Sequence, residues 1–344
     1  METMTAFRLL EWGRPPELVP VPVPVPAAGQ VLVEVAAVGL CHTDLHFMEA
    51  PPGAFPFPVP FTLGHEIAGR VVDLGEGVSG VMAGDGVVVA EGPRCWRCVS
   101  CLRGEDNLCA RRSAGRGWGL DGGLTRYVSV SSREVVPLQS LDPMAAAPLS
   151  DAGVTAYHAV RRLAPRLRGG SAAVVIGIGG LGAFAVQILR QLTPSRVVAV
   201  DSLPDRLAVG RRLGADETLL AADATPAAVR DLTDGDGADA VLDFVGTQGT
   251  MDLALQTARP GGGIAIVGAG GGTASIGWGT LPHDCDLFIP LGGTTADLHD
   301  VVALAQAGRI GIDVDPFPFA AVADAYARVR EGSVRGRAVV TGAP

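Results

Sequence analysis

The chain has 344 residues, enough for about two domains of ~100–200 residues each, and its 48% hydrophobic and 18% charged residues exclude a chain disordered by excess charge. The formal net charge of −9 argues against a nucleic-acid-binding protein and against an anionic membrane surface as partner. All 27 basic residues are arginine, so every mechanism that needs a Schiff-base lysine is excluded.

The N-terminal part of the chain has the pattern of a small β domain. Residues 1–10 include charged side chains and lack the apolar segment of a secretion signal, so we expect a cytoplasmic protein. Residues 19–26 read VPVPVPVP, and because proline has no backbone N–H, this run predicts an extended edge segment. A buried strand is predicted at 31–38, and the glycine-punctuated residues 61–90 predict short strands, typical of a barrel.

A cysteine and a histidine with metal-ligand chemistry lie in this predicted domain. Cys41 follows the strand at 31–38, and His65 precedes the next strand. With one further ligand they would hold a zinc ion whose fourth position is open, which is the arrangement of a catalytic zinc site. Spacing alone does not pair the two residues, so a buried cysteine and an unrelated histidine remain the alternative.

Four further cysteines are concentrated in the segment 95–109. The spacing C-x2-C-x2-C-x7-C allows short loops to place four thiolates around one ion, as in structural zinc sites. An iron–sulfur cluster fits less well because of the gap of seven and the missing trailing Cys-Pro. Four free thiols in a loop are the other alternative. The predicted ligands are Cys95, Cys98, Cys101 and Cys109.

From about residue 150 the pattern changes to alternating strands and helices, which favours a parallel sheet with helices on both faces. Strands are predicted at 173–177, 196–201, 240–245 and 263–267, and helices at 181–192, 205–213, 226–232 and 250–258. Two later helices, at 296–308 and 320–331, and a final strand at 337–340 are expected to return to the N-terminal domain.

A glycine-rich turn in the first of these strand–helix units predicts dinucleotide binding. Gly177 allows a tight turn, Gly179 lets a pyrophosphate approach the backbone, and Gly182 lets the helix pack on the strand. The turn residues are Gly177, Gly179, Gly180, Leu181 and Gly182. Asp201 ends the next strand, 19 residues beyond Gly182, where a carboxylate binds the ribose diol and repels a 2′-phosphate, which favours NAD. A buried turn without a ligand, or a membrane span over the apolar residues 172–189, is the alternative.

These motifs, in this order and at these separations, resemble the zinc-dependent alcohol dehydrogenases of the medium-chain dehydrogenase/reductase family. The resemblance runs nearly end to end. Its carriers are GLCHTD at 39–44, GHE at 64–66, the four-cysteine lobe, DAGVTAY at 151–157, the glycine turn, and GR at 336–337. Residues 148–158 and 331–337 are most similar to bacterial members that act on secondary alcohols and ketones.

The resemblance implies an α/β protein of two domains. A GroES-like catalytic domain, a partly open β-barrel, is expected at 1–152 and 293–344, with the structural zinc lobe at 95–109. A Rossmann domain, a doubly wound parallel sheet that binds NAD, is expected at 153–292. The implied cofactors are NAD and two zinc ions per chain. The implied assembly is a homo-oligomer, a tetramer rather than a dimer.

The resemblance also implies roles for single residues of the catalytic domain. Cys41, His65 and Asp151 become ligands of the catalytic zinc, which Glu66 can approach transiently. Asp44 orients His65, and Thr43, the cofactor ribose and His46 form a proton relay. From local sequence alone, Asp151 is a helix N-cap, Thr43 a turn residue and His46 a solvated side chain.

Further residues follow from the same resemblance. Arg337 is expected to reach the cofactor pyrophosphate and Arg206 to cover the adenine. A mostly apolar substrate pocket is expected from Phe47, Phe55, Trp118, Leu291 and Gly292. The predicted reaction is hydride transfer between NAD and a small alcohol–ketone pair, with a secondary alcohol that carries apolar substituents. The alternatives are a polyol, sugar or aldehyde dehydrogenase, a nucleotide-binding protein without turnover, and a zinc-ribbon interaction module.

Overall fold

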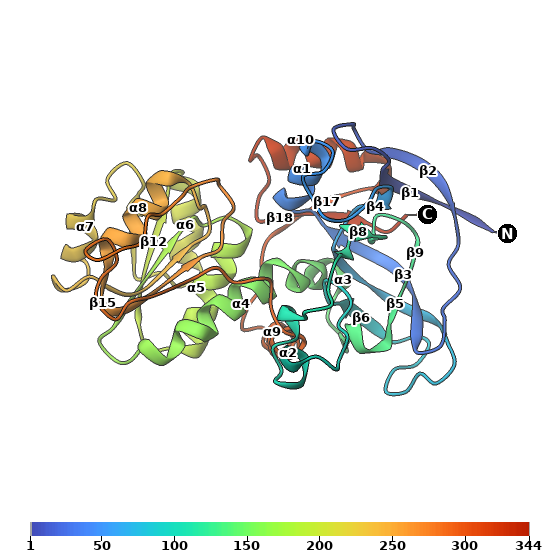
Figure 1. The fold of residues 1–344 in the computed structure, drawn as a ribbon, viewed down its shortest axis with the longest axis horizontal. Helices are drawn as coiled ribbons and strands as arrows, with labels where there is room; N and C mark the ends of the chain where they lie inside the picture. The colour runs from blue at the N-terminus through green and yellow to red at the C-terminus, as the bar shows by residue number, and fades with distance from the viewer. Residues whose placement is uncertain (1, 344) are drawn as a thin grey trace. The chain divides into compact units, whose positions relative to one another are not determined.

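The computed structural model describes residues 2–343 and divides the chain into two compact units (Figure 1). The first unit comprises the residues up to Val154 and those from Thr294 onward, whereas the second is the continuous segment Thr155–Gly293. The second unit is therefore inserted into the chain of the first. Among the described residues, every helix is too short or too polar to cross a membrane.

The first unit is built around a seven-stranded sheet with the order β10-β6-β5-β3-β18-β17, in which β9 also pairs with β3. A second sheet has the order β2-β1-β4, and β7 and β8 form a small pair. The strands of this unit are β1 (Thr3–Leu9), β2 (Glu17–Pro22), β3 (Gln30–Gly39), β4 (Phe61–Thr62), β5 (Glu66–Leu74), β6 (Gly86–Val89), β7 (Gly115–Arg116), β8 (Gly119–Leu120), β9 (Tyr127–Ser131), β10 (Val135–Pro137), β17 (Val314–Phe317) and β18 (Arg337–Thr341).

Two predictions about these strands are confirmed. The proline-rich β2 pairs only with β1, at the edge of its sheet, because alternating prolines cannot donate hydrogen bonds on a second side. The C-terminal β18 returns to the N-terminal part of the chain and pairs antiparallel with β3 and parallel with β17. Apolar side chains from these strands, among them Phe61, Ile67 and Val87, form the core of the unit together with Leu63 from the loop after β4.

Short helices connect the strands of the first unit. They are α1 (His42–Glu49), α2 (Val99–Leu102), α3 (Pro143–Ala146), α9 (Thr295–Gln306) and α10 (Val322–Arg330), with 3-10 turns at Asp106–Leu108, Ser132–Glu134, Ala147–Ser150 and Phe319–Ala321. Helix α4 (Ala152–Leu163) begins in the first unit and ends in the second. Helix α10 packs against α1, which brings the C-terminal region next to the residues that follow β3.

The second unit contains a six-stranded parallel sheet with the order β13-β12-β11-β14-β15-β16. Its elements are the 3-10 turn Ala164–Arg166, β11 (Ala172–Ile176), α5 (Gly180–Leu192), β12 (Arg196–Asp201), α6 (Pro204–Arg212), β13 (Glu217–Leu220), α7 (Pro226–Asp231), β14 (Ala238–Asp243), α8 (Gln248–Thr257), β15 (Ala258–Ile266) and β16 (Asp286–Phe288). The apolar stretch 172–189 is β11, a tight turn and most of α5, so it is the buried centre of this unit. The predicted α/β fold class is confirmed.

Candidate active site and metal-ligand clusters

Four buried side chains of the first unit form a cluster of metal-ligand type. Cys41, His65, Glu66 and Asp151 each offer one ligand atom, and these atoms all lie within 4.8 Å of one another. Cys41 lies between β3 and α1, at the positive end of the helix dipole, and His65 comes directly before β5. Asp151 lies between a 3-10 turn and α4. The fold thus brings Asp151 to three donors that precede it by more than 80 residues in the sequence.

Asp44 binds three groups around this cluster. Its Oδ1 lies 3.1 Å from His65 Nδ1, and its Oδ2 accepts hydrogen bonds from Tyr326 Oη at 2.9 Å and from the Cys41 backbone N–H at 3.3 Å. A carboxylate at Nδ1 favours the imidazole tautomer whose Nε2 faces the cluster, where Asp151 Oδ2 lies 3.5 Å away. Tyr326 was not predicted, because a tyrosine on a distant helix carries no local signal of such a contact.

Arg337 lies in the same cluster and binds two of its acids. Its Nε donates to Glu66 Oε2 at 3.1 Å, and its Nη2 contacts Glu66 Oε1 and lies 3.2 Å from Asp151 Oδ2. Its side chain is only 7% exposed. Gly39 makes room for the Glu66 carboxylate, since a Cβ at Gly39 would lie 1.8 Å from Oε2. The structure therefore gives Arg337 two carboxylate partners, and its predicted contact with the cofactor stays a prediction.

The charges of the cluster suit a bound dication. Burial raises the pKa of Glu66 to about 8, although Arg337 opposes the shift. Burial alone would lower the pKa of His65, but Asp44, Asp151 and Cys41 outweigh it and leave that pKa well above its usual value. The carboxyl groups of Glu66 and Asp151 share one guanidinium, that of Arg337. Thiolate, imidazole and carboxylate are the donors that zinc takes in proteins, so the residues fit this metal.

The four cysteines of the lobe form a second cluster of ligand atoms within 4.8 Å of one another. Cys95 Sγ and Cys101 Sγ are 3.9 Å apart. Two sulfurs at ~2.3 Å from a tetrahedral zinc ion lie about 3.8 Å apart, so the spacing fits zinc. Hydrogen bonds from the backbone of Cys101 and Ala110 lower the pKa of Cys98 to about 6, whereas burial raises the pKa of Cys101 to about 12. Metal binding would therefore release protons from this lobe.

In the glycine turn of the second unit, the backbone requires glycine at positions 177 and 182 but not at position 179. Gly177 has a φ of +86°, and a Cβ at Gly182 would lie 1.8 Å from the Gly177 carbonyl oxygen. A Cβ at Gly179 would meet nothing within 4 Å. Asp201 at the end of β12 accepts hydrogen bonds from Ile178 N at 2.7 Å and from Leu203 N at 2.9 Å, so it is fixed against the turn.

Two family models and several known proteins match this chain. Residues 27–140 match the alcohol dehydrogenase GroES-like domain, and residues 180–307 match the zinc-binding dehydrogenase domain. An NAD-dependent alcohol dehydrogenase of Sulfurisphaera tokodaii is 34% identical over 318 residues, which cover 89% of this chain and 90% of that protein. The D-arabinose 1-dehydrogenase (NADP(+)) of Saccharolobus solfataricus is 34% identical, with 98% and 97% covered. The alcohol dehydrogenase structure from Aeropyrum pernix aligns with a TM-score of 0.90 at 33% identity, covering 98% and 99% of the two chains.

The chain belongs to the zinc-dependent alcohol dehydrogenases of the medium-chain dehydrogenase/reductase family. The family predicted from the sequence is thereby confirmed, and the protein is an oxidoreductase.

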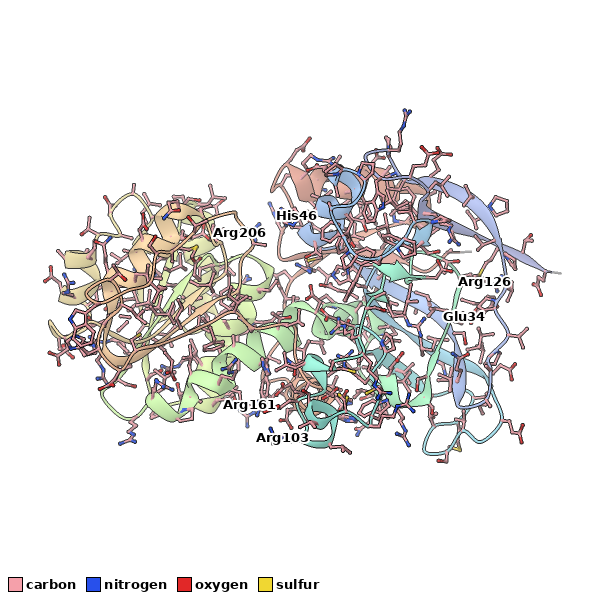
Figure 2. The ribbon with its side chains drawn as sticks, in the orientation of Figure 1. Glu34, His46, Arg103, Arg126, Arg161 and Arg206 are labelled. Atoms are coloured by element: carbon pink, nitrogen blue, oxygen red, sulfur yellow. The ribbon has the colours of Figure 1, made fainter. Side chains whose placement is uncertain are left out.

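In this alcohol dehydrogenase the predicted relay residues lie on α1, next to the metal-ligand cluster. Thr43 Oγ1 is 3.5 Å from Cys41 Sγ, and the Thr43 side chain is exposed. His46 is one turn further along α1 and is also exposed (Figure 2). In the second unit Arg206 lies on α6, five residues beyond Asp201 (Figure 2).

The predicted pocket residues fall into two groups. Phe47 and Phe55 are in contact, with ring centroids 5.0 Å apart, and both contact Phe57, which in turn lies 5.7 Å from the ring of Trp118. These aromatic side chains of the first unit form one continuous apolar group, in which Phe57 was not predicted. Leu291 and Gly292 belong to the second unit, where Leu291 is 52% exposed and Gly292 has a φ of +51°. Their place in a substrate pocket stays a prediction.

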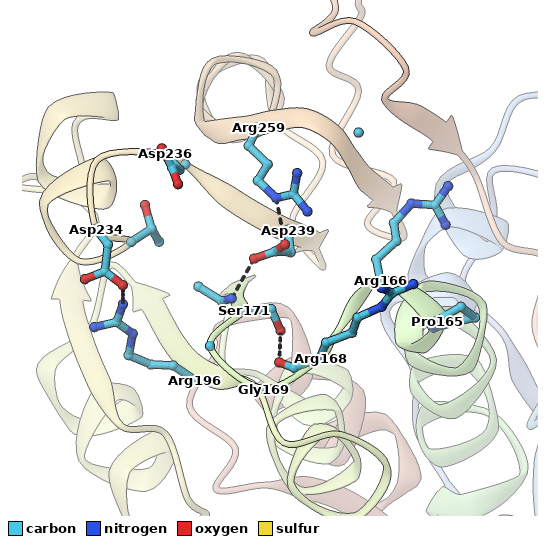
Figure 3. Close-up of a pocket in the computed structure, with 15 residues that line it drawn as sticks. Pro165, Arg166, Arg168, Gly169, Ser171, Arg196, Asp234, Asp236, Asp239 and Arg259 are labelled. Carbon is cyan, nitrogen blue, oxygen red and sulfur yellow. Dashed lines mark hydrogen bonds and ion pairs between the residues drawn. The ribbon is translucent and has the colours of Figure 1, made fainter.

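A cavity of about 530 Å³ lies in the second unit of this alcohol dehydrogenase, at the amino ends of its parallel strands (Figure 3). Dinucleotides bind instead at the carboxyl ends of such strands, where Gly177 and Asp201 lie. Four of the charged side chains around the cavity form two ion pairs, Arg196 with Asp234 at 2.9 Å and Arg259 with Asp239 at 2.6 Å. These ion pairs link residues near the amino ends of the parallel strands.

Proposed function

We propose that this enzyme transfers a hydride between NAD and an alcohol–ketone pair at the cluster of Cys41, His65 and Asp151. The observation that carries the proposal is the meeting of these three buried donors with Thr43 and Asp44 on one side of the first unit. A bound zinc ion supplies Lewis-acid polarisation of an alcohol oxygen. The names of the relatives from Sulfurisphaera tokodaii and Aeropyrum pernix support the reaction class.

The chain's own residues would move the proton and hold the ligands. Thr43 takes the proton from the alcohol, and the exposed imidazole of His46 passes it to solvent. Asp44 holds His65 in one tautomer through the 3.1 Å contact at Nδ1. Glu66, paired with Arg337, would be a further carboxylate ligand that a metal ion in this cluster could use.

NAD rather than NADP is proposed as the cofactor because of Asp201. Both of its oxygens are held by backbone N–H groups at the carboxyl end of β12, and each keeps a lone pair for a ribose hydroxyl. A carboxylate fixed there repels a 2′-phosphate. In this proposal Gly179, Gly180 and Leu181 contact the pyrophosphate.

The finer features of the proposal rest on the family resemblance and the ligand sets. The first unit would be the catalytic domain and the second the NAD-binding domain, with one catalytic zinc and one structural zinc at Cys95, Cys98, Cys101 and Cys109. The substrate would be a small secondary alcohol, and the enzyme a cytoplasmic homo-oligomer, a tetramer rather than a dimer. Metal analysis and analytical ultracentrifugation measure the zinc count and the assembly.

NAD reduction by the purified enzyme tests the function. Primary alcohols, secondary alcohols and polyols are offered with NAD, and each is repeated with NADP. We expect turnover with secondary alcohols and NAD and at least tenfold lower kcat/KM for NADP. The proposal would be contradicted by an enzyme that binds NAD and two zinc ions but oxidises none of these alcohols.

Thr43→Val tests the proton relay. Loss of the hydroxyl is expected to lower kcat by a factor of about 10²–10⁴, the usual contribution of a positioned proton-transfer group. Thr43→Ser is the matched control and should keep most of the activity. Zinc content and NAD affinity should stay unchanged in both variants, and an unchanged kcat in Thr43→Val would exclude the relay role.

A further inference from the structure

A buried ion pair in the first unit has no part in the function described so far. Arg112 Nη2 lies 3.1 Å from Glu91 Oε2, and the two side chains are 4% and 14% exposed. The Arg112 guanidinium also lies over the ring of Trp118, 4.6 Å from its centroid. Arg112 Nε and Nη1 are buried and have no hydrogen-bond acceptor among the described residues. The Glu91 carboxylate is therefore the one acceptor among these residues that the guanidinium reaches.

This pair lies beside the metal-ligand cluster. Strands β5 and β6 are antiparallel, with Ile67 opposite Val89, and continuing that register by two residues brings Glu91 alongside His65. The loop after Arg112 lies against the same place, because a Cβ at Gly117 would be 2.9 Å from His65 N. Burial and the negative charge of Asp151 raise the pKa of Glu91, whereas the positive charge of Arg112 opposes this shift.

The pair presents an unused acceptor. Glu91 Oε2 is bound by Arg112 and the Glu91 carbonyl oxygen by Arg116 N, but Oε1 accepts no hydrogen bond from the described residues. The Trp118 ring, which lies against the Arg112 guanidinium, is in turn in contact with the ring of Phe57. A buried ion pair contributes little more to the free energy of folding than apolar side chains of the same size would. Stability alone therefore does not account for this pair, and recognition of a substrate group is the other role that it can serve.

We propose that Glu91, held by Arg112, is a specificity-determining residue that selects substrates with a second hydroxyl next to the reacting carbon, that is, vicinal diols and α-hydroxy ketones. This inference rests on the proposed function and narrows it. The second hydroxyl donates to Glu91 Oε1 while the first occupies the cluster of Cys41, His65 and Asp151. A substrate with only apolar substituents leaves the carboxylate without a donor.

The test compares two substrates that differ by one hydroxyl. The purified holoenzyme is assayed with NAD and the stereoisomers of butane-2,3-diol and of butan-2-ol. We expect kcat/KM for at least one diol to exceed that for butan-2-ol tenfold or more. Glu91→Leu is expected to lower this ratio at least tenfold, and Glu91→Gln, which keeps an oxygen acceptor, by a smaller factor.

The control is a second ion pair of the same unit. Glu34 and Arg126 form an exposed pair at 3.3 Å (Figure 2), and Glu34→Leu is expected to leave the substrate ratio unchanged. A wild-type preference for butan-2-ol, or a Glu91→Leu ratio within threefold of wild type, would overturn the inference and leave the reaction class standing. If Glu91→Leu does not fold, a ratio in Glu91→Gln equal to that of wild type overturns it. A wild-type enzyme that oxidises none of these alcohols overturns the proposed function instead.

Discussion

At the residue scale, Asp44 organises the candidate site. It is fully buried, and its carboxylate contacts the His65 ring nitrogen, the Tyr326 hydroxyl and the Cys41 backbone N–H. Each of these contacts fixes the carboxylate in the position that the other two contacts need. The phenol comes from Tyr326 on α10, whose pKa is raised well above its usual value by burial and by the neighbouring Asp44 charge. Tyr326 is therefore the donor in its hydrogen bond to Asp44 Oδ2.

Tyr326→Phe is expected to lower stability by about 1–3 kcal/mol, because it removes a buried hydrogen bond to a charged acceptor. The measurement is the shift of the denaturant midpoint of the first unit. Tyr127→Phe is the control, since its hydroxyl makes a 3.4 Å contact with the exposed Glu34 and should cost less than about 0.5 kcal/mol. Equal effects of the two substitutions would contradict the role of Tyr326.

Gly179→Ala tests whether this glycine is needed for cofactor binding and not for folding. Because a Cβ at Gly179 meets nothing within 4 Å, the variant is expected to keep the wild-type melting temperature. A pyrophosphate that approaches the backbone there would collide with the methyl group, so NAD affinity should fall at least tenfold in a calorimetric titration. Unchanged affinity would show that Gly179 is not in contact with the cofactor.

Sequence motifs predicted the ligand types of the site but not their neighbours. The four cysteines and the glycine turn have characteristic local spacings, so each motif could be identified from its own short segment of sequence. Cys41, His65 and Asp151, in contrast, could be grouped only through the family resemblance. Tyr326, the pair Glu91–Arg112 and the contact of Arg337 with Glu66 join residues far apart in the chain. No local pattern marks such contacts, because they depend on which strands become neighbours.

At the element scale, the cysteine lobe is bound to helix α9. Arg94 Nε donates to Asp106 Oδ2 at 3.1 Å, and Asp106 also accepts from the hydroxyl of Thr295 at 2.6 Å and from its backbone N–H at 3.2 Å. Thr294 caps the same helix together with Asp297. The lobe thus holds the first turn of α9, at the point where the chain re-enters the first unit.

Asp106→Ala is expected to destabilise the first unit by about 3–5 kcal/mol, since it leaves the Arg94 charge buried without its partner. Amide hydrogen exchange in residues 294–303 should speed up in the same variant. Glu49→Ala, which breaks the exposed pair with Arg330, is the control and should cost less than about 1 kcal/mol. Unaltered exchange in α9 would show that the lobe does not hold this helix.

The strands of the second unit that the sequence failed to predict are short. Strand β13 has four residues, all half-buried, and β16 has three, so neither shows the alternation or the apolar run by which strands are recognised. Both lie at the edges of the parallel sheet, where few contacts constrain the sequence. Strands β11, β12 and β14 and helix α5 were predicted to within two residues, whereas β15 begins at Ala258, five residues before its predicted start.

At the scale of the whole molecule, the second unit has the features of an independent domain. Its six strands, its core and its glycine turn all lie between Thr155 and Gly293. A fragment of residues 152–293 is therefore expected to fold cooperatively and to bind NAD, as measured by circular dichroism and calorimetry. The same fragment with Gly182→Ala should lose binding, because its Cβ would collide with the Gly177 carbonyl. An unfolded wild-type fragment would contradict this independence.

The position of β18 determines when the active site is completed during protein synthesis. Residues 337–341 are synthesised after every other strand of the first unit, yet they form the strand between β3 and β17 and carry the arginine that binds Glu66 and Asp151. Until they emerge, β3 has an open edge and the two acids lack their cation. The inserted second unit can fold during translation. The candidate site whose first ligand is Cys41 is therefore complete only once residues 337–341 have been synthesised and have paired with β3.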